Sequence, residues 1–274
     1  MSENSKNNFK MARCSLIVTC RCNLKCKLCS AYSPYYEIPP HFSYDILSES
    51  IDRYFKLVSY VDKFTFSGGE PLLHKDLTRL VRHILKYSNQ FGYIEIITNG
   101  TIVPDTQLVE TINQNKSKVM FLLDNYGKEL SIKIEEISNL FNANNIRYVI
   151  RGNNKDDAHC GGWVDYGDFS KKLFIQKDVE ELFNKCALPQ KMNFCFRIIY
   201  GEMHPCGISY RCMELKIIPK NKNEYVNLFD DRVTTEYQQK KIAMIQSAKS
   251  LTACAYCNGL CEDSPRFTPA EQLN

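Results

Sequence analysis

Residues 12–150 alternate between short apolar runs and amphipathic stretches, and this alternation constrains the fold more than any other feature of the chain. The run CSLIVTC at 14–20 is apolar and β-branched, which is typical of a buried strand. Residues 43–60 place their apolar side chains on one helical face, with Ser43 as the N-cap. The same patterns predict further strands near 63–68, 93–98, 118–123 and 146–150, with helices near 74–88, 105–114 and 130–144.

Strands that alternate with helices predict an α/β fold in which a parallel sheet carries its helices outside. The carboxyl ends of parallel strands meet at one edge of such a sheet, and ligands bind there. The candidate ligand-binding residues follow the predicted strands: a cysteine loop after the first, then Gly68, Gly69 and Glu70, then Asn99, Asp124 and Arg151.

Three cysteines, Cys22, Cys26 and Cys29, stand at CxxxCxxC spacing in the segment CNLKCKLC. Three thiolates at this spacing can hold three irons of a 4Fe–4S cluster, and no fourth cysteine follows at a matching interval. One iron would then stay open to a small molecule, as a catalytic zinc keeps one open position. Zinc ligands usually come as paired CxxC knuckles, so the spacing favours an iron–sulfur cluster over zinc.

The overall composition is consistent with such chemistry. The chain has 13 cysteines among 274 residues, and its polar start lacks the apolar core of a secretory signal. No apolar run is long enough to cross a membrane. We therefore expect a cytoplasmic protein whose clustered cysteines bind metal or do redox work. Basic residues number 35 against 31 acidic ones and are scattered, which argues against a nucleic-acid surface.

Taken with SGGEP at Ser67–Pro71, the cysteine motif makes residues 12–261 resemble the radical SAM superfamily. The resemblance implies a partial (β/α)6 barrel in which S-adenosylmethionine chelates the open iron. Reductive cleavage then gives a 5′-deoxyadenosyl radical, which abstracts a hydrogen atom from the substrate. The electron would come from a donor such as flavodoxin or ferredoxin. Leu28 departs from the pattern, because many members carry an aromatic residue at this position.

The resemblance also assigns roles at the strand ends. Gly68 and Gly69 would let backbone approach the methionine ammonium group, and Glu70 would add an acceptor. Asp124 suits the ribose hydroxyls, and Arg151 suits a carboxylate or could be the basic group beside the substrate. The alternatives are a salt bridge at the barrel rim for Asp124 and Arg151. Asn99 joins the cofactor-binding residues, with a plain turn residue as its alternative.

A second cysteine group resembles the SPASM and twitch extensions of this family, which bind auxiliary clusters. The chain ends soon after Cys261, so a twitch-like domain with one auxiliary 4Fe–4S cluster fits better than a full SPASM domain. Its expected ligands are Cys186, Cys206, Cys254 and Cys257, with Cys195, Cys212 and Cys261 as spare candidates. The alternative is a structural zinc on Cys254, Cys257 and Cys261.

These patterns divide the chain into a flexible tail at 1–11, a radical SAM barrel at 12–175 and an auxiliary-cluster domain at 176–274. The last part should contain a helix near 176–186 and a β-hairpin turning at Tyr200-Gly201. Residues 152–175 are rich in Gly and Asp, and a sixth strand is expected within or beside HCGGWVDYG at 159–167.

A fully ligated second cluster is a suitable one-electron acceptor, which favours an oxidative outcome for a substrate radical. We therefore expect an oxidoreductase that acts on a small hydroxylated substrate, sugar- or aminocyclitol-like, as the butirosin-pathway aminocyclitol dehydrogenase of this family does. The alternative is a ribosomal-peptide maturase that crosslinks or epimerises its substrate. An epimerase needs a hydrogen-atom donor, and Cys160 is the candidate. A non-catalytic electron carrier is disfavoured, because it needs no open iron.

Overall fold

The computed structural model describes residues 8–152 and 162–273, and its strands form one eight-stranded sheet in the order β5-β4-β3-β2-β1-β6-β7-β8. Neighbours from β5 to β6 pair parallel, whereas β7 and β8 continue the sheet antiparallel. The strands are β1 (Lys10–Thr19), β2 (Tyr60–Gly68), β3 (Phe91–Thr98), β4 (Val119–Asn125), β5 (Arg147–Gly152), β6 (Phe196–Ile199), β7 (Glu202–His204) and β8 (Val226–Asn227).

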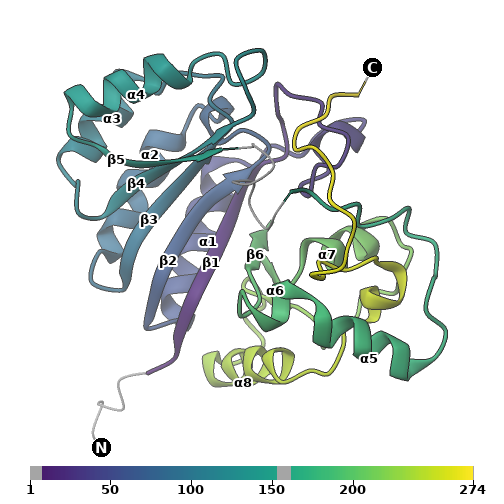
Figure 1. The fold of residues 1–274 in the computed structure, drawn as a ribbon. Helices are drawn as coiled ribbons and strands as arrows, with labels where there is room; N and C mark the ends of the chain where they lie inside the picture. The colour runs from purple at the N-terminus through teal and green to yellow at the C-terminus, as the bar shows by residue number, and fades with distance from the viewer. Residues whose placement is uncertain (1–7, 153–161, 274) are drawn as a thin grey trace, which may run out of the picture.

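In the strand order of the sheet, the helices form two groups, one on each side of β1 (Figure 1). The first group follows strands β1 to β4 and consists of α1 (Tyr44–Leu57), α2 (Leu77–Ile84), α3 (Thr106–Asn113) and α4 (Ile134–Ala143). The second group gathers beyond β6 and consists of α5 (Gln176–Lys185), α6 (Ala187–Gln190), α7 (Gly207–Glu214) and α8 (Thr235–Gln246). Short 3-10 turns lie at Ser33–Tyr35, Pro71–Leu73, Leu85–Tyr87 and Thr252–Tyr256.

The two faces of the parallel sheet differ in chemistry. Phe64 and Phe66 of β2 are fully buried, and the Phe64 ring lies 5.4 Å from the Tyr54 ring of α1. Side chains alternate along a strand, so Lys63 and Thr65 point to the opposite face. There the Lys63 ammonium and the Thr65 hydroxyl both contact the Glu95 carboxylate, at 3.1 and 3.3 Å. Helices therefore cover an apolar face, and the other face carries polar groups.

The predicted series of strands and helices through 150 is confirmed, including Ser43 as the N-cap of α1. The prediction of a sixth strand at 159–167 is wrong for the described residues 162–167, where Trp163 makes only an isolated bridge to Phe267. The strand that joins β1 is β6, through the pairs Ser15↔Arg197 and Leu16↔Ile198. The segment FRII, apolar apart from Arg197, supplies this edge because β1 is buried on both sides.

The predicted hairpin is confirmed as β6–β7, closed by Tyr200 and Gly201 with φ of 47° and 71°. Positive φ at both turn residues matches the right-handed twist of two-residue hairpins. A Cβ on Gly201 would lie 2.3 Å from the Phe229 ring, so glycine is also required for space.

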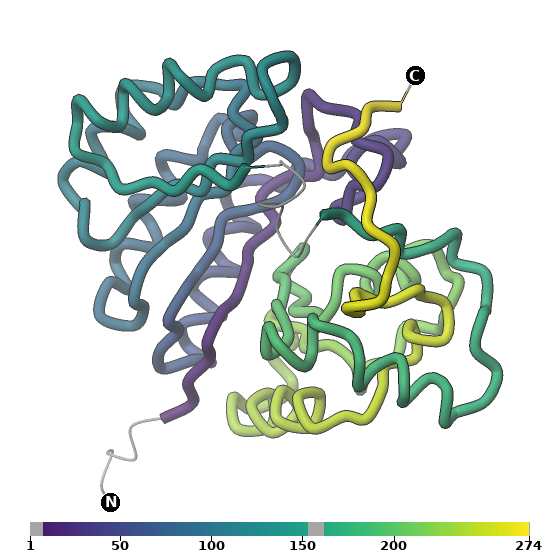
Figure 2. Tube along the Cα trace, in the orientation of Figure 1, coloured from purple at the N-terminus to yellow at the C-terminus, as the bar shows by residue number. Residues whose placement is uncertain are grey.

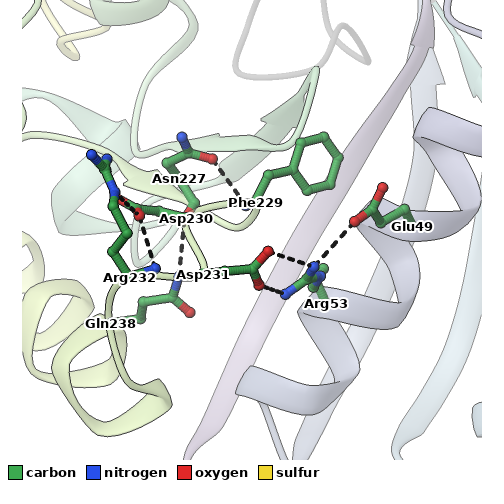
Figure 3. A network of polar contacts seen from close by, with 8 residues as sticks. All are labelled: Glu49, Arg53, Asn227, Phe229, Asp230, Asp231, Arg232 and Gln238. Atoms are coloured by element: carbon green, nitrogen blue, oxygen red, sulfur yellow. Dashed lines mark hydrogen bonds and ion pairs between the residues drawn. The ribbon is translucent and has the colours of Figure 1, made fainter.

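Contacts also tie the second helical group to α1. Arg53 of α1 forms an ion pair with Asp231, in the loop between β8 and α8, and lies 3.3 Å from Glu49 (Figure 3). Asp230 and Arg232 pair with each other beside it. Because β6 pairs directly with β1, residues on both sides of position 175 share one sheet, and the division into two domains there stays a prediction.

None of the helices in the described residues is long and apolar enough to cross a membrane.

Candidate active site

The first cysteine set lies on the loop that follows β1, at the carboxyl edge of the sheet. Cys26 is 6% exposed, whereas Cys22 and Cys29 are half-buried. The Leu24 N–H donates to the Cys22 sulfur at 3.4 Å. Burial raises the pKa of Cys22 to about 11 and that of Cys26 to about 12. Buried thiols of this kind become thiolates when a bound cation offsets the charge, which fits a cluster ligand.

The glycine pair brings two backbone segments together. Gly69 N–H donates to the Thr19 carbonyl at 2.8 Å, and Glu70 N–H donates to the Arg21 carbonyl at 2.9 Å. A Cβ on Gly68 would lie 2.1 Å from the Thr19 oxygen, and one on Gly69 would lie 2.2 Å from the Arg21 oxygen. The glycines were expected to permit approach to a ligand. The approach that the structure describes is to the backbone leading into the cysteine loop.

Glu70 is fully buried and binds backbone with both carboxylate oxygens. Oε1 accepts the Leu72 N–H at 3.0 Å, and Oε2 accepts the Asn99 N–H at 2.8 Å. Burial raises the pKa of this carboxyl to about 7, although the two N–H donors lower it. Glu70 therefore holds the ends of β2 and β3 together. This structural role is separate from the ligand contact that the sequence predicts for Glu70.

Asn99 connects this network to the cysteines. Its Nδ2 donates to Asn23 Oδ1 at 3.0 Å and lies 3.6 Å from the Cys22 sulfur. Its Oδ1 accepts the Thr101 N–H at 3.0 Å. The structure thus places Asn99 beside the first cysteine set, with its side chain bonded to the loop.

Asp124 and Arg151 are adjacent in the β4–β5 ladder and bind each other. Arg151 Nε lies 2.5 Å from Asp124 Oδ1, and Nη2 lies 2.7 Å from Oδ2. Burial lowers the pKa of Arg151, but the bonds to Asp124 outweigh burial and raise it overall. The salt-bridge alternative is therefore present in this structure, although the pair leaves further donors on the guanidinium.

Two residues at this edge were not anticipated. The buried Ser131 hydroxyl lies 2.7 Å from the Asn99 carbonyl and 2.9 Å from the Asp124 carbonyl, so it joins the ends of β3 and β4. Tyr126 donates its hydroxyl to Asp124 at 3.3 Å. Its pKa is raised mainly by burial and further by Asp124, Cys26 and Cys29. Neither residue belongs to a motif, so only the fold reveals them.

The second cysteine set lines one pocket. Its lining is otherwise apolar and includes Phe183, Leu188, Phe194 and Ile208. All four expected auxiliary ligands line it. Cys186 lies at the end of α5, Cys206 at the start of α7, Cys254 in the Thr252–Tyr256 turn and Cys257 directly after that turn. The spare candidates Cys195, Cys212 and Cys261 do not line this pocket.

The thiols surround a space instead of converging on a point. Within 8–152 and 162–273, no three His, Cys, Asp or Glu side chains are close enough to hold a single metal ion. A cluster of several irons is wider than one ion, and an apolar pocket with four thiols suits a fully ligated cluster.

A further pocket, the middle pocket, is lined by residues that neighbour both cysteine sets in the sequence. Ser30, Ala31 and Tyr32, which follow Cys29, line one side, and Arg197, His204 and Gly207, near Cys206, line another. Arg197 donates to the Ser30 carbonyl at 3.2 Å and forms none of the ion pairs found in the described part of the chain. Among the same residues, the Tyr32 hydroxyl and His204 Nδ1 are buried without a hydrogen-bond partner.

Three further cysteines lie outside the two proposed ligand sets. Cys160 lies outside the described residues, so its role as hydrogen-atom donor stays a prediction. Cys14 and Cys20 are buried and belong to the hydrophobic core.

Residues 16–158 match the family described as the Radical SAM superfamily. The chain is 24% identical over 272 residues to the GTP 3′,8-cyclase of Clostridium botulinum (strain Okra / Type B1), covering 93% of this chain and 78% of that protein. It is also 30% identical over 95 residues to the S-adenosylmethionine-dependent nucleotide dehydratase of Selenomonas ruminantium, covering 35% and 32% of the two chains.

Solved structures share the fold. Native anSMEcpe with bound AdoMet aligns with a TM-score of 0.56 and 15% identity over 95% of this chain and 93% of that one. BtrN in complex with AdoMet and 2-DOIA aligns with a TM-score of 0.55 and 14% identity over 95% and 99%. With the family match over more than half of its length, the chain belongs to the radical SAM superfamily and carries a cysteine-rich region after its barrel strands.

Proposed function

We propose that this radical SAM enzyme uses two 4Fe–4S clusters to oxidise a small hydroxylated substrate. The observation that carries the proposal is the middle pocket, whose lining includes Ser30 to Tyr32, which follow Cys29, and Gly207, which follows Cys206. Cys22, Cys26 and Cys29 would hold the first cluster, and Cys186, Cys206, Cys254 and Cys257 the second.

When bound, the first cluster with S-adenosylmethionine supplies the 5′-deoxyadenosyl radical, and the second supplies a one-electron acceptor. The chain positions the first site through Gly68, Gly69 and Glu70, which fix the strand end before Cys22. Asp124 and Arg151, near Tyr126 and the cysteine loop, would contact the ribose and carboxylate of S-adenosylmethionine.

The middle pocket would hold the substrate. Arg197 keeps guanidinium donors free, and the Tyr32 hydroxyl and His204 Nδ1 lack partners among the described residues. Burying polar groups without partners costs free energy, so substrate oxygen atoms that bind them would bring a net gain. Loss of a hydrogen atom from a carbon that bears a hydroxyl, then of a proton and an electron, leaves a ketone. The second cluster, held by the four auxiliary cysteines, would be the acceptor for that electron.

The proton lost from the substrate hydroxyl needs an acceptor, and Arg151 is the basic group that the sequence analysis offers for this role. A guanidinium that is paired with Asp124 keeps its charge, so Arg151 would donate hydrogen bonds and would not accept the proton. Neither Arg151 nor Asp124 lines the pocket proposed for the substrate, whereas His204 does, and its unpartnered Nδ1 would take the proton. The proposal thus changes the role expected for Arg151 from base to fixed charge.

A second candidate is a reaction on a nucleotide. The relatives named above are a GTP 3′,8-cyclase and a nucleotide dehydratase, and the first aligns over 93% of this chain. In the middle pocket, Arg197 has no carboxylate partner among residues 8–152 and 162–273, and its guanidinium suits a phosphate as well as a hydroxyl group. Peptide maturation, by crosslinking or epimerisation, remains the third candidate, with Cys160 as the residue on which epimerisation would depend.

Substitution of one auxiliary ligand tests the division of labour. We expect Cys206→Ala to cleave S-adenosylmethionine at close to the normal rate and to form no oxidised product, because the first cluster is intact and the electron acceptor is lost. The readouts are 5′-deoxyadenosine and product by chromatography, with sugar alcohols, aminocyclitols and GTP as probe substrates.

The epimerase alternative predicts the opposite pattern. There, Cys160→Ala would consume S-adenosylmethionine without normal product, and Cys206→Ala would stay active. Observation of that pair of results would replace the oxidase proposal with an epimerase.

A further inference from the structure

The segment that follows the auxiliary cysteines returns to the loop of the first cysteine set. Figures 1 and 2 show it, in yellow, beside the purple loop that follows β1. Cys26 and Gln272 form an antiparallel bridge. Lys27 N–H donates to the Glu271 carbonyl at 2.7 Å, and Leu273 N–H donates to the Lys25 carbonyl at 2.8 Å.

The side chain of Gln272 adds three hydrogen bonds to this pairing. Oε1 accepts the Lys25 N–H at 2.8 Å. Nε2 donates to the Ala270 carbonyl at 2.7 Å and to the Cys26 sulfur at 3.4 Å. The orientation of the amide is determined by these partners, since Lys25 N–H can only donate and the Ala270 carbonyl can only accept.

Hydrogen bonds to a ligating sulfur have a known physical effect. Reduction of a cluster adds negative charge, part of which resides on the sulfurs. An N–H that points at sulfur stabilises the reduced form and raises the midpoint potential. The effect is larger where water is excluded, and Cys26 is 6% exposed.

We propose that Gln272 is a positioning residue for the radical cluster: it fixes Cys26 in the loop, and its N–H to the Cys26 sulfur raises the cluster potential. The inference rests on the proposed role of Cys26 as a cluster ligand. It also gives the segment at 267–273 a function, because this segment joins the region of the auxiliary cysteines to the first site. Phe267 strengthens that link through mutual backbone hydrogen bonds with Trp163, at 2.8 and 3.1 Å.

The test compares wild type with two substitutions at one position. Gln272→Leu removes both the donor and the acceptor. Gln272→Glu keeps an acceptor for the Lys25 N–H but has no donor for the sulfur. The control is Glu271→Gln in the same segment, because Glu271 is exposed and, among the described residues, its side chain pairs with Lys27 alone, at 3.4 Å.

Each protein is reconstituted without oxygen and titrated with dithionite. The readouts are iron content and the midpoint potential of the EPR signal that changes on addition of S-adenosylmethionine, which identifies the cluster with the open iron. We expect a more negative potential in both Gln272 variants and a wild-type potential in Glu271→Gln. Retention of iron in Gln272→Glu would show that the shift does not come from loss of the site.

Two results would overturn the inference. A wild-type potential in Gln272→Leu would show that the N–H to sulfur has no effect, and a shift in Gln272→Glu alone would be an effect of added charge. If wild type itself lacks a signal that responds to S-adenosylmethionine, the proposed function fails, and the inference fails with it.

Discussion

Glu70 and Asn99 join the ends of two neighbouring strands: the Glu70 carboxylate accepts the Asn99 N–H at 2.8 Å in a fully buried setting. The same Asn99 side chain lies 3.6 Å from the Cys22 sulfur. One carboxylate therefore fixes a strand end, and that end supports the cysteine loop. The glutamate of the GGE motif has a structural task that its expected contact with a ligand does not explain.

Removal of this carboxylate should destabilise the fold. Glu70→Ala would leave the buried Asn99 N–H without an acceptor, at about 1–3 kcal/mol, and the partly buried Leu72 N–H as well, at a smaller cost. The measurement is the free energy of unfolding in urea. Glu49→Ala is the control, since its exposed salt bridge to Arg53 contributes about 0–1 kcal/mol. Equal losses in the two variants would contradict the role assigned to Glu70.

The stability of the protein without iron should depend on pH through Glu70. Burial raises its pKa from 4.5 to about 7, so between these values the native state binds more protons than the unfolded state. Stability should therefore fall as pH rises through this window. Glu70→Gln cannot titrate and should show a flatter profile in thermal unfolding. A wild-type profile in that variant would place the titration elsewhere.

Cleavage of S-adenosylmethionine should depend on the first cysteine set. Changing Cys22, Cys26 and Cys29 together to Ala should abolish formation of 5′-deoxyadenosine by the reduced protein, because the open iron would be lost. Cys14→Ala is the matched control: Cys14 is buried in β1 and lies outside the motif and outside the lining of both pockets. The assignment is wrong if the triple variant cleaves at the normal rate.

Iron content should report two clusters. We expect about eight irons per chain in wild type and about four in the triple variant, as two cubane clusters and one require. Cys212→Ala should keep the wild-type content, since Cys212 does not line the auxiliary pocket. Metal analysis that finds zinc in place of the second set of iron would exclude the auxiliary cluster.

Local sequence patterns were sufficient to predict the strands and helices up to residue 150 and to identify the first cysteine motif. Strands near 14–20, 63–68 and 93–98 are confirmed because a buried strand shows either an apolar run or an alternation of apolar residues, and both patterns are readable without the fold. The placement of motifs at one edge follows from parallel pairing. The strand expected at 159–167 failed for its described part because β6, from 196–199, pairs with β1 across a long stretch of sequence.

What the sequence determined by itself is the class of chemistry: the spacing of Cys22, Cys26 and Cys29 and the strand–helix series depend on residues close together in the chain. The tertiary structure decided which side chains and backbone groups form hydrogen bonds and ion pairs with each other. Glu70 binds backbone, Asp124 pairs with Arg151, and Gln272 reaches Cys26, each across a separation that no local pattern records. The physical reason is that buried polar groups must find partners, and packing, which is not local, decides which partners are within reach.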